Sequence, residues 1–273
     1  MLSAPDLALP PTPAVYLLLV SLPLLVLSEA NSVHAGHAIF KILSSIAFLS
    51  GPFISAEWSE YHRLITFGLL FSFVGDICLI PSRTEYFDAP SVSGKGTSSR
   101  ASPKKETIST TFKIGVLAFA AAHICYTAAF LQNSEEVSWP VFASTFVVSI
   151  AAANWLGAIY PARTPSRWSN FLNLSMPSDM LPLVSIYVII ISMMLAVSAA
   201  TIVPASSFQH QRFLGATMFV ISDAFVAYDA FGKGNMHLGA KKVDIRRQSW
   251  VRMTMGWGLY FWGQMILAGT VYV

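Results

Sequence analysis

Charged residues are scarce in this chain. Lysine, arginine, aspartate and glutamate make up 11% of the 273 residues, against about 25% in a typical soluble domain. The mean hydropathy is +0.58, and long apolar runs recur from end to end, which is typical of an integral membrane protein. The composition therefore excludes an ordinary soluble domain, and no nucleic-acid partner is expected.

Cysteine and the common hydrolase motifs are also rare or missing. The two cysteines, Cys78 and Cys125, both lie within apolar runs, so no disulfide framework is predicted. The sequence holds no GxSxG, no HExxH and no Cys/His ligand spacing, which counts against a serine hydrolase or a zinc protease. The first apolar run follows no basic segment, so we interpret it as a retained helix and not as a signal peptide.

The apolar runs predict an all-α fold: a polytopic bundle of about eight transmembrane helices forming a single domain over residues 1–273. About 20 apolar residues cross a bilayer core. By this measure the predicted spans are 14–28, 37–54, 63–80, 112–131, 139–160, 182–202, 209–231 and 250–271.

The basic residues divide unevenly between the two sides of such a bundle. One side receives only Arg63 and Arg212. The other receives Arg83, Lys95, Arg100, Lys104, Lys105, Lys113, Arg163, Arg167, Lys233, Lys241, Lys242, Arg246, Arg247 and Arg252. An excess of lysine and arginine marks the cytoplasmic side, so the basic connections are predicted to be cytoplasmic. The endoplasmic reticulum or another internal membrane is the expected location.

The connection 81–111 is rich in serine, glycine and lysine, and it lacks the apolar residues that would form a core. It is therefore predicted to be a flexible cytoplasmic loop.

Three ionisable residues lie inside the predicted spans. Asp76 occurs in "FSFVGDICLI", Asp223 in "FVISDAFVAY" and Lys41 in "IFKILSSIAF". At the helical rise per residue, they lie about 6–8, 12 and 6 Å from the cytoplasmic ends of their spans. A charge at membrane depth is costly and usually faces a cavity or a partner. Their similar depth on three helices predicts one shared site, although Lys41 alone could instead extend to the lipid headgroups.

Other polar residues in the spans are candidates to complete this site. His123 and Tyr126 share a helix face at i, i+3, and Tyr260 and Gln264 share one at i, i+4. Taken singly, a histidine in such a position is more often a packing residue, and a tyrosine or glutamine is more often an interhelical hydrogen-bond group. Two serines lie close to the carboxylates and could donate to them, namely Ser72 at i−4 from Asp76 and Ser222 just before Asp223.

Two carboxylates close together in an apolar site do not both ionise, so such a pair holds a proton at neutral pH. The pair could then act as general acid and general base in a hydrolysis. The same groups could relay protons in a transporter or lipid flippase, or the carboxylates could simply pair with Lys41 in a scaffold. A metal held by Asp76, Asp223 and His123 has no spacing signature and is not predicted, but the sequence leaves open whether a metal takes part.

Five segments occur in an order that resembles the YhhN-like lysoplasmalogenase family, over residues 37–271. They are "FSFVGDICL", "FKIGVLAFAAAHICY", "LPLVSIY", "GATMFVISDAFVAYDAF" and "GLYFWGQMILAG". The most specific elements are the Gly-Asp pair at 75–76, the His-x-x-Tyr pattern at 123–126 and the Ser-Asp pair at 222–223.

This resemblance implies an eight-helix membrane enzyme that cleaves the vinyl ether bond of lysoplasmalogens, without a cofactor. The products would be a fatty aldehyde and glycerophosphoethanolamine or glycerophosphocholine, and the partners a lysophospholipid substrate and membrane lipids. Asp76 and Asp223 would be catalytic. The implied substrate-binding residues are Lys41, Ser72, His123, Tyr126, Tyr187, Ser222, Tyr260 and Gln264. The sequence leaves the headgroup, the oligomeric state and the identity of the acid open.

Overall fold

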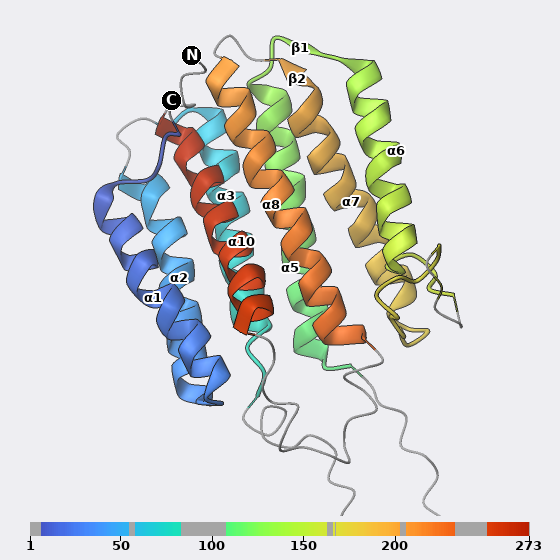
Figure 1. Cartoon of the computed structure of the whole chain (residues 1–273). Coiled ribbons are helices and arrows are strands. Elements are labelled where there is room, and N and C mark those ends of the chain that lie inside the picture. Colours follow the sequence, from blue (N-terminus) through green and yellow to red (C-terminus); the bar gives the residue numbers. More distant parts are fainter. Residues whose placement is uncertain are drawn as a thin grey trace, which may run out of the picture.

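Eight α-helices form the part of the chain that the computed structural model describes, which comprises residues 7–54, 58–82, 108–162, 166, 168–202, 206–232 and 250–272. The helices lie side by side as one bundle, with both described ends of the chain at the same end of it (Figure 1). They are α1 (Thr12–Ala30), α2 (His34–Ile54), α3 (Glu60–Cys78), α5 (Thr110–Gln132), α6 (Trp139–Leu156), α7 (Leu181–Ala200), α8 (Ser206–Phe231) and α10 (Trp250–Gly269).

The remaining regular structure is short and lies at the end of the bundle that holds the termini (Figure 1). Strand β1 (Glu136–Val137) pairs antiparallel with β2 (Thr201–Ile202), with Glu136 opposite Ile202. The 3-10 helix η1 (Thr270–Tyr272) follows α10 directly. This end is the one predicted to face away from the cytoplasm.

The all-α polytopic bundle predicted from the sequence is confirmed. Each predicted span corresponds to one observed helix, and the largest boundary difference is four residues, between 160 and Leu156 at the end of α6. Gly157 follows with a φ of 93°, a left-handed conformation that ends the helix. Since the residues beyond it are still apolar, hydropathy alone extended this span too far.

Five of the eight helices are long and apolar enough by composition to cross a membrane, namely α1, α5, α6, α7 and the part of α8 from His210. The other three, α2, α3 and α10, have similar lengths but carry ionisable groups such as Lys41, Asp76 and Arg252. These three helices contact one another, and α10 also packs against α1 and α8. These three helices are thus grouped, whereas α6 has no buried residue and lies at the edge of the bundle (Figure 1).

Close helix contacts depend on glycine at particular positions. On α3, a Cβ at Gly68 would lie 2.6 Å from Cδ1 of Tyr126, and one at Gly75 would lie 2.7 Å from Cε2 of Phe119. Both partners lie on α5, so the absent side chains allow these two helices to approach each other.

Two earlier predictions concern the connections. Helix α5 begins at Thr110, so the last two residues of the predicted loop 81–111 are helical. Most of that loop, from 83 to 107, lies outside the described residues. The same applies to residues 233–249, and therefore to most of the basic residues that set the predicted sidedness.

Candidate functional site

A cavity of about 440 Å³ opens in the half of the bundle predicted to be cytoplasmic. Its walls come from seven helices and are mostly apolar, with side chains such as Phe119, Val184 and Phe225. Six of the predicted site residues line it: Lys41, Asp76, Tyr187, Ser222, Asp223 and Tyr260. The two intramembrane carboxylates, from α3 and α8, therefore face the same space.

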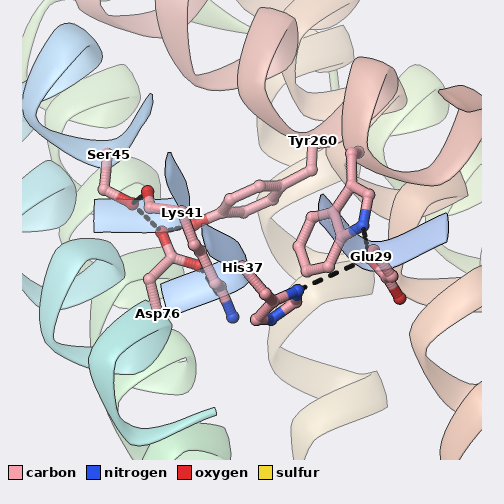
Figure 2. A network of polar contacts seen from close by, with 7 residues as sticks. Glu29, His37, Lys41, Ser45, Asp76 and Tyr260 are labelled. Carbon is pink, nitrogen blue, oxygen red and sulfur yellow. Dashed lines mark hydrogen bonds and ion pairs between the residues drawn. The ribbon is translucent and has the colours of Figure 1, made fainter. Parts of the chain in front are cut away.

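Asp76 is held by donors from two neighbouring helices (Figure 2). Its Oδ2 accepts hydrogen bonds from the hydroxyls of Ser45 and Tyr260, both at 2.7 Å. Lys41 Nζ lies 3.7 Å from Oδ1, and both charged side chains are 2% exposed. A cation and two hydroxyl donors stabilise the carboxylate, so this side of the cavity holds a buried ion pair.

Asp223 has different surroundings. The hydroxyl of Tyr187 is hydrogen-bonded to its Oδ2, and Nε2 of His123 lies 3.0 Å from the same hydroxyl. On the other side of the imidazole, Nδ1 lies 3.2 Å from Sδ of Met194. Among the described residues no lysine or arginine forms an ion pair with Asp223. The second carboxylate is therefore connected to a chain of uncharged side chains.

Four predicted site residues do not line the cavity. His123 lies behind Tyr187, as described above. Tyr126 donates to Oε1 of Gln264 at 2.8 Å, and Ser72 lies 3.3 Å from the Tyr126 hydroxyl. All four are fully buried. Their positions favour interhelical hydrogen bonding between α3, α5, α7 and α10 over direct substrate contact.

The predicted serine donors have other partners. Ser72 is bonded to Tyr126 and not to Asp76, and Ser222 donates to the carbonyl of Phe219 at 2.7 Å, not to Asp223. Helical serine hydroxyls readily bond a carbonyl of the preceding turn, which explains why proximity in sequence to Asp223 was misleading. The donors to the two carboxylates are instead Ser45, Tyr260 and Tyr187.

Sequence reasoning missed several polar residues in or beside the cavity. Ser45 follows Lys41 by four residues on the same helix face, so its spacing could have indicated it. Glu29, His37, Trp257 and Arg252 line the cavity nearer to its predicted cytoplasmic end. They lie close to helix ends, where polar residues are common in any membrane protein, and so gave no distinct signal. Asp229, near the end of α8, also lines the cavity.

Metal binding has no support in the geometry of the described residues. No group of three or more histidine, cysteine, aspartate or glutamate side chains lies close enough within them to hold an ion.

The fold and the cavity define a class: a polytopic membrane protein with buried ionisable groups around a mostly apolar cavity. Within that class, the chain belongs to the YhhN family, whose model matches residues 36–271. This confirms the resemblance drawn from the motifs over 37–271. Searches of curated proteins and of solved structures gave no match.

Proposed function

We propose that this protein hydrolyses the vinyl ether bond of lysoplasmalogens, releasing a fatty aldehyde and a glycerophospho-alcohol. Membership of the YhhN family supports a lysoplasmalogenase-like activity. The observation that carries the proposal is that Asp76 and Asp223, on different helices, line one mostly apolar cavity. A single-chain lipid fits an apolar space, and an acid-labile ether needs an acid and a base within it.

The surroundings of the two carboxylates support a division of roles. Asp76, with Lys41 Nζ at 3.7 Å and two hydroxyl donors, is suited to remain ionised. It would stabilise a cation and accept a proton from water.

Asp223 is suited to hold a proton, because no lysine or arginine among the described residues forms an ion pair with it and an apolar site disfavours an unpaired charge. The Tyr187 hydroxyl donates to Oδ2 of Asp223, which leaves Oδ1 for the proton. Nε2 of His123, 3.0 Å from the same hydroxyl, completes the hydrogen-bond chain behind Asp223. We therefore assign Asp223 as the acid.

The reaction follows from these roles. Asp223 protonates the alkenyl carbon β to the ether oxygen, which leaves an oxocarbenium ion that the Asp76 carboxylate stabilises. Water adds to the cationic carbon and transfers a proton to Asp76, giving a hemiacetal. Asp76 returns that proton to the departing glycerol oxygen, while the hemiacetal hydroxyl gives its proton to Asp223. The aldehyde leaves, and both carboxyl groups are restored.

The test is aldehyde release from a 1-alkenyl lysophospholipid by the purified protein in a maltoside detergent. The saturated 1-alkyl lipid serves as the control substrate, because it has no double bond to protonate. Aldehyde from the alkenyl lipid alone is the expected result. Its absence from a folded sample would refute the hydrolase, and lipid movement across proteoliposomes without aldehyde would identify a transporter instead.

Amide variants then test the residues. Asp76→Asn and Asp223→Asn are each expected to lower kcat by about 10²-fold or more, the usual contribution of a general acid or base. Asp179→Asn is the matched control, because Asp179 is 41% exposed and pairs with Lys113 outside the cavity. Full turnover in both cavity variants would show that the two-carboxylate mechanism is wrong.

A further inference from the structure

A second set of polar side chains lines the cavity beyond the two carboxylates. It consists of Glu29, His37, Asp229, Arg252 and Trp257, contributed by α1, α2, α8 and α10. We propose that these residues bind a zwitterionic phosphate headgroup, with Arg252 at the phosphate and Glu29 at the ammonium. This inference rests on the proposed function, because it takes the reacting bond to lie at Asp76 and Asp223.

Depth along the helices supports the assignment. Tyr260 donates a hydrogen bond to Asp76. Arg252 precedes Tyr260 by eight residues of α10, which is about 12 Å along the helix axis. Asp229 follows Asp223 by six residues of α8, about 9 Å. In a lysophospholipid the phosphorus is five bonds from the vinyl ether oxygen and the nitrogen nine, so they reach about 6 and 11 Å. A lipid reacting at the carboxylates would therefore place its headgroup among these residues.

Arg252 has the features of a phosphate ligand. Its Nη2 lies 3.2 Å from Oδ1 of Asp229, and the guanidinium lies over the ring of Tyr228 at 5.0 Å. Its enclosed Nε has no hydrogen-bond partner within the described part of the chain. The planar guanidinium has five N–H donors in a fixed fork that matches phosphate oxygens. Asp229 orients the guanidinium through Nη2, and the N–H group of Nε is left to donate to a ligand.

Glu29 has the features of an ammonium ligand. Its Oε2 accepts a hydrogen bond from Trp257 Nε1 at 2.5 Å and lies 3.7 Å from Nδ1 of His37 (Figure 2). The indole already attracts a cation, since Lys41 Nζ lies 5.1 Å from its ring centroid. An ammonium paired with Glu29 would lie at the rim of this ring, and aromatic side chains commonly line the sites of ammonium ligands. The 23% exposure of Glu29 leaves room for a ligand beside it.

The charges around the cavity also favour a zwitterion over an anion. Glu29 interacts electrostatically with Asp229, Lys41 and Arg252, so the headgroup would meet both signs. A lipid with a bare phosphate would face Glu29 and Asp229 without an ammonium to match them. An uncharged alkylglycerol would use neither Arg252 nor Glu29. The order of affinity is therefore predicted to be phosphoethanolamine lipid, then glycerophosphate lipid and alkylglycerol.

The experiment measures binding of three saturated 1-alkyl lipids, which cannot be cleaved, to the purified protein in maltoside by native mass spectrometry. The three lipids carry phosphoethanolamine, phosphate alone or no headgroup. Glu29→Gln is expected to weaken binding of the phosphoethanolamine lipid about tenfold, equivalent to about 1.4 kcal/mol, and to leave the alkylglycerol unchanged. Arg252→Gln is expected to weaken both phosphate lipids, and Arg252→Lys to restore only part of the loss because it lacks the fork.

Matched controls lie at the opposite end of the bundle, where Glu136→Gln and Arg63→Gln change exposed residues and should alter no affinity. Equal weakening of all three lipids by the cavity variants would indicate a purely structural role and overturn the inference. So would equal affinity of the wild-type protein for all three. Because the readout needs no chemistry, a protein that prefers the zwitterion but releases no aldehyde would refute the hydrolase and retain the headgroup site.

Discussion

Replacing Lys41 by methionine is expected to destabilise the protein through the buried ion pair. At 3.7 Å, the attraction between Lys41 and Asp76 is about 4.5 kcal/mol for an effective dielectric constant of about 20. Removing one member of such a pair leaves an uncompensated buried charge and typically costs about 3–5 kcal/mol. Lys41→Met should therefore lower the midpoint of unfolding in maltoside detergent by at least about 6 °C.

The double variant Lys41→Met with Asp76→Asn separates stability from chemistry. With both charges removed, the stability should recover most of the loss, giving a coupling of at least about 2 kcal/mol between the two sites. Aldehyde release should remain as slow as in Asp76→Asn alone, because the carboxylate that accepts the proton is gone. If the double variant instead lost as much stability as the two single variants added together, the ion-pair argument would be refuted. If the double variant recovered activity as well as stability, the Lys41–Asp76 ion pair would serve only to stabilise the fold. That outcome would support the scaffold hypothesis for this pair.

Two further predictions concern packing and the acid. Gly68→Ala should cost about 1–3 kcal/mol by overpacking against Tyr126, which its Cβ would approach. Gly258→Ala, with nothing within 4 Å of the new Cβ, should be neutral or stabilise by up to about 1 kcal/mol in thermal unfolding; equal effects would contradict this. Tyr187→Phe removes the hydroxyl bonded to Asp223 and should lower kcat about 10–100-fold with little change in KM. An unchanged kcat would exclude the proposed hydrogen-bond chain.

The helices could be predicted because a bilayer sets the length of an apolar run, and few other folds contain such runs. Lys41, Asp76 and Asp223 could be predicted for the same reason, since each is an isolated ionisable group in an apolar run. How the helices pack against one another could not be predicted from the sequence. Glu29 meets Trp257 because α1 packs against α10, and no spacing along the chain encodes that contact. Ser45 is the exception, because its position four residues after Lys41 is a local signal.

Helices α2, α3 and α10, which are not among the five helices that are apolar enough by composition to cross a membrane, build the Asp76 side of the cavity. An isolated α2 or α3 would expose Lys41 or Asp76 to lipid, at a cost of up to about 2.5–3.5 kcal/mol for each charge, the value for a charge at the bilayer centre. Helices α2, α3 and α10 contact one another, and their charged and hydroxyl groups meet at Asp76. The same polar residues that weaken each helix as a separate span therefore stabilise the three together. This arrangement also explains why the Asp76 site lies between helices and not on any one of them. An ionised carboxylate at membrane depth, such as that of Asp76, persists only where neighbouring helices supply a cation and donors.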